Sequence, residues 1–212
     1  PSFYLSFLQF PHTYVAGETF IDLNENGFYD DGIDTAIDTA YSYLGSELGI
    51  KILPGAKNVY MATSSGYMNS DWITGDAQNK NELRNYLMAK LRSGEILNPC
   101  NWVYTSIFGN ANCSEINPYY WVSGDPRIPY GWIWTQNGDM RMLGNSAKFS
   151  LIENEPVDLI AAYTCARGTD ALNSITVTKN KVNYAIGHYA TNFSQVPVSV
   201  SYENLLPDNF SL

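Results

Sequence analysis

The sequence predicts an α+β fold that is rich in strands, an antiparallel or mixed sheet or sandwich accompanied by two helices. Short runs with alternating or continuous apolar character recur along the chain, which is typical of strands. Only two segments place apolar residues at helical spacing, and a long stretch rich in Gly, Pro, Asn and Trp lies between them. From the 212 residues we expect one domain over residues 1–203 and a linker over residues 204–212.

The expected strands cover residues 3–10, 14–23, 50–53, 147–152 and 157–166, with a last strand or extended tail at 197–202. The segment 157–166 is almost continuously apolar, which favours a central position in a sheet. Residues 63–79 are rich in Ser, Gly, Asn and Asp and predict a loop.

The two helices are expected at about residues 81–93 and 172–189. The apolar positions of the first recur at helical spacing and are Leu83, Leu87, Met88 and Leu91, with Gly94 as a natural stop. The apolar face of the second would carry Leu172, Ile175, Val182, Ile186 and Tyr189. Residues 94–146 predict a long irregular segment, and such a length is expected to serve function or assembly.

Negative charge is concentrated in the first quarter of the chain. The net charge is −9, and residues 1–50 hold eight acidic residues but no Lys or Arg. Nucleic-acid backbones require a cationic surface, so we expect no nucleic-acid partner. No run of about 18 apolar residues is present, so we also expect no membrane span.

An acidic loop in this first quarter has the spacing of a calcium-binding loop. Oxygen-bearing side chains stand at positions 1, 3, 5 and 9 of the loop, with a glycine at position 6 and a backbone carbonyl at position 7. The expected ligands are Asp22, Asn24, Asn26, the carbonyl of Phe28, and Asp30. Position 12 is Ile33, so a bidentate ligand would come from Asp31 or Asp34, or be missing. The alternative is a solvated Asn/Asp/Gly turn.

Three cysteines are present. Cys100 and Cys113 flank a short polar stretch, which predicts a disulfide that closes this loop. Cys165 lies in the apolar segment 157–166, so we expect a buried, unreactive thiol. No cysteine and histidine spacing typical of a zinc site occurs.

Aromatic residues crowd the irregular segment, and they could serve as a platform for sugar rings, as local core, or as a face buried against a partner. The candidate contacts to a sugar or a partner are Trp121, Trp132 and Trp134. Three arginines stand near acids, Arg127 near Asp125, Arg141 near Asp139 and Arg167 near Asp170, and ion pairs are favoured over catalysis there.

Several stretches spread over most of the chain carry a resemblance. They are Ile21–Asp30, Pro54–Asn58, Asn98–Cys100, Ser123–Pro126, Gly131–Trp132, Gly138–Leu143, Phe149–Leu151, Glu155–Tyr163, Arg167–Thr176 and Leu206–Leu212. These resemble segments of secreted surface proteins of the Bacteroidetes–Ignavibacteria group that carry a sorting domain for type IX secretion. The resemblance implies an extracellular or cell-surface location outside the outer membrane, and a sorting domain beyond the 204–212 linker. It also implies possible O-glycans at Thr35 and Thr39, and it supplies no catalytic residues.

Two functional hypotheses follow. No sequence signature of a serine hydrolase, metalloprotease or nucleotide enzyme is present, which favours a non-catalytic structural protein or adhesion module, stabilised by Ca²⁺. Its partners would be copies of itself or other surface proteins, in a surface layer, sheath or filament, and residues 3–10 are a candidate for strand exchange. The alternative is a carbohydrate-binding or carbohydrate-active module, with a cleft lined by Trp132 and Trp134 and acids such as Asp125 and Asp139.

Overall fold

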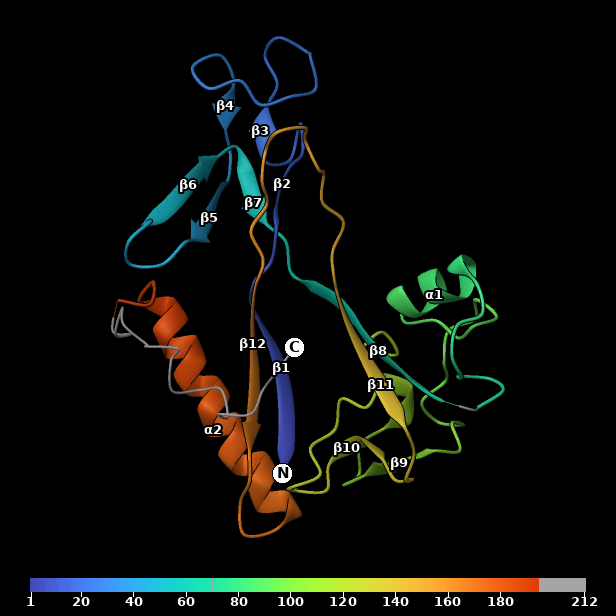
Figure 1. Ribbon diagram of the computed structural model, residues 1–212. Coiled ribbons are helices and arrows are strands. Elements are labelled where there is room, and N and C mark those ends of the chain that lie inside the picture. Colours follow the sequence, from blue (N-terminus) through green and yellow to red (C-terminus); the bar gives the residue numbers. More distant parts are fainter. Residues whose placement is uncertain (70, 195–212) are drawn as a thin grey trace, which may run out of the picture.

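The computed structural model describes residues 1–69 and 71–194 (Figure 1). Strands account for 33% of the structure and helices for 16%, which confirms the predicted strand-rich α+β class. The expected strand at 197–202 and the linker at 204–212 lie outside the described residues.

The strands are β1 (Ser2–Gln9), β2 (His12–Tyr14), β3 (Phe20–Ile21), β4 (Thr35–Ala36), β5 (Thr39–Tyr43), β6 (Ile50–Pro54), β7 (Ala56–Asn58), β8 (Met61–Met68), β9 (Thr105–Phe108), β10 (Gly131–Trp134), β11 (Met140–Ser146) and β12 (Ile160–Ala166). The helices are α1 (Lys80–Leu87) and α2 (Ala171–Ala190), and a short 3₁₀ helix covers Cys113–Glu115.

The strands form six antiparallel pairs rather than one wide sheet within the described residues. The pairs are β1–β12, β2–β7, β3–β4, β5–β6, β8–β11 and β9–β10. In Figure 1, α2 lies on one side of the β1–β12 pair and β8–β11 on the other, with α1 beyond β8, while β2 to β7 form the opposite end of the molecule from β9–β10. Each pair therefore depends on its neighbours to cover its faces.

The β1–β12 pair, which we call the ribbon, carries mostly small side chains on one face. The register pairs Ser2 with Ala166, Tyr4 with Thr164 and Ser6 with Ala162 on this face, so its paired residues are small apart from Tyr4. Helix α2 packs on this face and buries its own small residues at a spacing of four, Ser174, Thr178 and Val182. The hydroxyl of Thr178 donates to the carbonyl of Ser2 at 3.3 Å.

Helix α2 is confirmed, and so is the burial of Val182 on its expected apolar face, where Ile175 and Tyr189 are half-buried, but the expected face is wrong at two positions. Leu172 and Ile186 are exposed. Helix α2 can approach the Ser and Ala side chains of this face closely only where it also presents small residues. Ser174 and Thr178 therefore occupy buried positions that larger residues were expected to fill.

Helix α1 is shorter than the predicted 81–93. Asn79 caps its start, because its side-chain oxygen accepts from the backbone N–H of Asn81 and Glu82 at 3.0 and 3.1 Å. The helix ends at Leu87, since Ala89 adopts a left-handed backbone with φ of 51° and Lys90 then pairs with Ile96. Tyr86 is its buried residue; the expected Leu83, Leu87 and Met88 are exposed.

Three strand predictions need correction. The expected strand 14–23 is broken by a turn in which Val15 accepts from Glu18 and Thr19, so β2 and β3 are separate. Residues 63–68 of the expected loop belong to β8, which pairs with β11 where the irregular segment was expected to end. Residues 147–152 have no regular structure, and β12 lies in a two-stranded ribbon rather than at the centre of a sheet.

Candidate functional site

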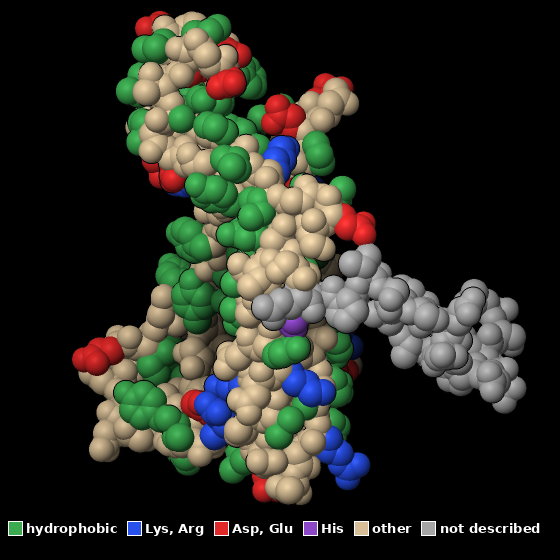
Figure 2. All heavy atoms as spheres, turned by 90° about the vertical axis from the view of Figure 1, so that its left-hand side faces the viewer, with side chains coloured by type: hydrophobic (Ala, Val, Ile, Leu, Met, Phe, Trp, Pro, Cys, Tyr) green, Lys and Arg blue, Asp and Glu red, His purple; other side chains and the backbone are tan. Residues whose placement is uncertain are grey.

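The acidic loop is a hairpin loop closed by the shortest sheet of the molecule. β3 and β4 pair Phe20 with Ala36 and Ile21 with Thr35, which brings the two ends of residues 22–34 together. The ring of Tyr29 anchors the loop by lying over Gly55, where a Cβ atom would come within 2.5 Å of the ring. Acidic side chains gather at this end of the molecule in the view of Figure 2.

The candidate calcium ligands form one network of hydrogen bonds. Asp22 accepts from the backbone N–H of Asn26 and Gly27, at 3.2 and 2.7 Å. One carboxylate oxygen of Asp30 accepts from the side-chain amides of Asn24 and Asn26 at 2.8 and 2.7 Å. These amide bonds favour the charged form and lower the pKa of Asp30 below its ordinary value.

Asp34 closes the loop next to position 12 of the calcium-type spacing, where Ile33 offers no side-chain ligand. Its two oxygens accept from the backbone N–H of Leu23 at 2.8 Å and of Asp30 at 2.7 Å. Of the two acids left open by the sequence, Asp34 thus joins the network, while Asp31 is exposed on its rim. The side chain of Phe28 is exposed, and its N–H donates to Asn26 at 2.8 Å.

The donor set of the loop is compatible with Ca²⁺ but is arranged here for hydrogen bonding. Ca²⁺ takes six to eight oxygen ligands. In the described residues no group of three or more His, Cys, Asp or Glu side chains gathers as a metal site. A cation at this loop would therefore need the amides of Asn24 and Asn26 to turn, so that oxygen replaces nitrogen opposite Asp30.

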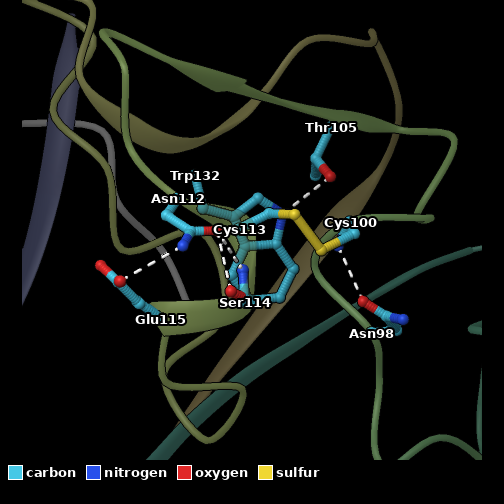
Figure 3. Close-up of a disulfide and its surroundings, with 8 residues drawn as sticks. All are labelled: Asn98, Cys100, Thr105, Asn112, Cys113, Ser114, Glu115 and Trp132. Atoms are coloured by element: carbon cyan, nitrogen blue, oxygen red, sulfur yellow. Dashed lines mark hydrogen bonds between the residues drawn. A yellow bond between two sulfur atoms is a disulfide. The ribbon is translucent and has the colours of Figure 1, made fainter.

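The predicted disulfide between Cys100 and Cys113 is present and closes the loop before the 3₁₀ helix (Figure 3). Asn98 accepts from the backbone N–H of Cys100 at 2.9 Å, and Asn112 accepts from that of Ser114 at 3.2 Å. Figure 3 also shows the indole N–H of Trp132, which donates to the hydroxyl of Thr105 at 2.7 Å.

The aromatic cluster is a core, which we call the tryptophan core. Its buried members are Tyr86, Ala89, Leu97, Trp102, Trp121 and Trp132. The ring centroid of Trp102 lies 5.3 Å from that of Trp121 and 5.9 Å from that of Trp132. Trp121 and Trp132 are 2% and 0% exposed, so neither offers the free ring face that stacking on a sugar would need, and Trp121 reaches the surface only where it lines a groove. Trp134 is half-buried and stacks on Tyr104.

Two of the three expected ion pairs between an arginine and a nearby acid are present. Asp125 is paired with Arg127 at 2.7 Å and with Lys179 of α2 at 3.2 Å, and Arg141 pairs with Asp139 and Asp76. Hydrogen bonds from Arg127 hold the pKa of Asp125 well below its ordinary value, so this carboxyl stays ionised and is unsuited to act as a general acid. No ion pair joins Arg167 to Asp170 among the residues described.

The two threonines that match the glycosylation pattern lie close together in the fold. Thr35 is exposed in β4, and Thr39 is half-buried in β5. A hydroxyl must be accessible to carry a glycan, so Thr35 is the better placed of the two.

The ribbon has an open face that the sequence did not predict. It carries Phe3, Leu5, Phe7, Ala161, Tyr163 and Cys165, which the register sets opposite one another in pairs. Phe3, Leu5 and Tyr163 are 58%, 53% and 70% exposed, and the rings of Phe3 and Tyr163 stack at 6.0 Å. Cys165 is an exposed free thiol, so its expected burial is wrong. The signal was present in the alternation of large and small residues in β1, but sequence alone does not say which face a helix covers.

An apolar groove adjoins the open face, between β1 and the β8–β11 pair, with a volume of about 400 Å³. Its lining, which defines the apolar groove, is Phe3, Tyr4, Leu5, Phe7, Met61, Ser64, Tyr120, Trp121, Val122, Ser123, Met142, Leu143 and Gly144. None of the described residues that line it carries a charge. At one point the groove is closed by direct contact, because a Cβ on Gly144 would lie 2.6 Å from the ring of Phe7.

Comparisons with known proteins identify no relative. No family model matches the chain, and neither curated proteins nor solved structures include a similar one. None of the helices in the described residues is long and apolar enough to cross a membrane.

Proposed function

We propose that this chain is a non-catalytic structural protein that assembles with copies of itself, as a subunit of an extracellular layer, sheath or filament or as an adhesion module. The observation that carries the proposal is the ribbon. β1 has eight residues without a charge or a proline, it pairs with β12 alone within the described residues, and Phe3 and Leu5 are more than half exposed. Natural edge strands usually carry charges or prolines that prevent association, and β1 carries neither.

The distribution of charge supports contacts between unlike ends. The first 50 residues hold eight acids and no base, whereas residues 167–194 hold Arg167, Lys179 and Lys181 against Asp170 alone. Figure 2 shows acidic side chains at the end formed by the 22–34 loop and basic ones toward the other end. Opposite charges at two ends favour head-to-tail contacts, which give open filaments when the rotation does not close.

We include Ca²⁺ and an extracellular location in the proposal. The convergence of Asp22, Asn24, Asn26 and Asp30 supports a cation in the acidic loop. The disulfide is compatible with an oxidising compartment, such as the cell exterior reached by type IX secretion. The carbohydrate alternative has less support. The rings of Trp121 and Trp132 are buried, and the lowered pKa of Asp125 keeps its carboxyl ionised.

Sedimentation velocity and negative-stain microscopy on the 212-residue chain test the proposal. We expect ordered assemblies at high protein concentration with Ca²⁺, and fewer with chelator. Tyr163→Ser on the open face should weaken them, while Tyr184→Ser is a matched control, because Tyr184 is 71% exposed but lies on α2. Monomers alone at high protein and Ca²⁺ concentration would contradict self-assembly.

A further inference from the structure

We propose that the apolar groove binds residues 196–202 of a second copy of this chain, added as a strand at the free edge of β1. The inference rests on the proposed self-assembly and names the segment and the surface that make the contact.

The groove offers both elements that strand addition requires. β1 pairs with β12 alone in the part of the chain that is described, so its other edge has no strand partner there, and consecutive residues of β1, Phe3 to Leu5, line the groove. Side chains of β1 and β11, among them Leu5, Phe7 and Leu143, provide an apolar lining. In strand addition the main chain gives affinity, and pockets for alternate side chains give specificity.

The sequence of residues 196–202 matches this surface. Val196, Val198, Val200 and Tyr202 alternate with Pro197, Ser199 and Ser201, so a strand here would have one apolar and one small, polar face. The segment has no charge, as the groove lining has none. Proline is tolerated at the start or outer edge of a strand, where its missing N–H is not needed.

The position of Ser194 favours a second copy as the donor. After α2 the chain is held at the β5–β6 hairpin, because the amide of Asn192 donates to the carbonyls of Gly45 and Gly49 at 2.8 and 3.0 Å. In Figure 1 this end of α2 lies on one side of the ribbon, and β8 and β11, whose residues line the groove, lie on the other. The chain's own segment would have to cross both strands before entering the groove, whereas the segment of a neighbouring copy would not.

Each copy would then donate one strand and accept another at a different surface. Such a contact is heterologous, and it extends into a filament unless the rotation closes a ring. This would explain why, within residues 1–69 and 71–194, an uncharged edge strand and large apolar residues such as Phe3, Leu5 and Tyr163 are left exposed.

Paired substitutions in the segment provide the first test, read by sedimentation velocity on the full chain. Val198→Asp places a charge on the face that would enter the groove, and Ser199→Asp places the same charge on the opposite face. We expect Val198→Asp to raise the concentration needed for assembly at least tenfold and Ser199→Asp to leave it nearly unchanged. Equal behaviour of the two variants, with assembly intact, would overturn this inference while leaving self-assembly standing.

Cross-linking identifies the donor. In a Cys165→Ser background, one tagged chain carries Leu5→Cys and a second, differently tagged chain carries Val200→Cys. Oxidation of the mixture should give a disulfide between the two tags, and the single variants should not. A chain carrying both substitutions that links only to itself would show that the segment folds back, which would overturn the second copy as donor. Absence of any assembly would overturn the proposed function as well.

Discussion

Large aromatic side chains are buried in the tryptophan core but exposed on the ribbon. Trp102, Trp121 and Trp132 are at most 8% exposed, although they lie in a segment of short strands and turns, whereas the ribbon leaves Phe3 and Tyr163 mostly in solvent. The tryptophan core is enclosed by α1, by β8 to β11 and by loops joined through the disulfide. In the described part of the chain, α2 covers one face of the ribbon, and Phe3, Leu5 and Tyr163 on the other face are more than half exposed. Burial here follows from how many elements surround a residue, not from how apolar its strand is.

The largest effect is expected from removing the centre of the tryptophan core. Trp132→Ala deletes a fully buried indole and its hydrogen bond to Thr105, which should cost about 3–5 kcal/mol of unfolding free energy. Tyr163→Ala in the ribbon is the counterpart, and a surface change of this kind should stay within about 0.5 kcal/mol in the monomer. Urea denaturation at low protein concentration measures both. Similar losses for the two variants would contradict the contrast between the regions.

Opening the disulfide should destabilise the tryptophan core by a somewhat smaller amount. The loop between Cys100 and Cys113 spans 13 residues, for which the chain-entropy model gives about 3 kcal/mol. The double variant Cys100→Ser/Cys113→Ser should therefore lower the urea midpoint, whereas Cys165→Ser should leave it unchanged, since this thiol is exposed and free. A shift with Cys165→Ser equal to that of the double variant would argue against this pairing.

Calcium should stabilise a third region, the acidic loop, by mass action. At a hundredfold excess over its dissociation constant, a cation that binds the native state alone adds about 2.7 kcal/mol, or about 5–10 °C in melting temperature for this size. Scanning calorimetry with Ca²⁺ and with chelator measures the rise. Asp22→Ala should abolish it, and Asp38→Ala, outside the network of Asp22, Asp30 and Asp34, should retain it. Identical melting curves with and without chelator would rule out the site.

A smaller effect of pH is expected just beyond the end of β1. Burial, aided by Lys51 and opposed by Glu155 and Asp158, lowers the pKa of His12 below its ordinary value of 6.5. The native state thus resists protonation, so stability is highest above about pH 6.5 and falls as the pH drops from there toward the lowered pKa. The urea midpoint of the native protein should fall between pH 7 and 5 more than that of His12→Gln. Parallel curves would show that His12 titrates normally.

Sequence patterns predicted the elements whose signal is local. The apolar run of β12, the strand at β1 and the cysteine pair each carry their own information, and the ligand spacing of the acidic loop placed Asp22, Asn24, Asn26 and Asp30 in one network. Patterns failed where a tertiary neighbour decides. The sequence of β8 resembles a loop because it is rich in Ser and Gly. In the structure Gly66 lies against Met140 and Met142 of β11 and the hydroxyl of Ser65 donates to the carbonyl of Tyr86, and nothing in the local sequence indicates these partners.

The same limit explains the candidate site. Alternation in β1 shows that Phe3, Leu5 and Phe7 share a face, but it does not show that α2 covers the opposite one. The small residues Ser174 and Thr178 of α2 indicate which face the helix covers, because they pack at close range against the Ser and Ala side chains of the ribbon. The prediction of sugar contacts for the tryptophans was wrong for a related reason. Composition identifies an aromatic cluster, but the elements around the cluster decide whether it faces a ligand or forms a core.

The parallel course of β1 and α2 has a mechanical consequence. Thr178 of α2 contacts Ser2 at the start of β1, and Tyr189 donates to Gln9 at its end, so Pro1 and Ser194 lie at opposite ends of the same layer. If neighbours pulled on the chain through these ends, tension would slide β1 along α2 and load the contacts at Ser2 and Gln9 together. Hydrogen bonds sheared together resist far more force than bonds unzipped one at a time, which would suit a filament under tension.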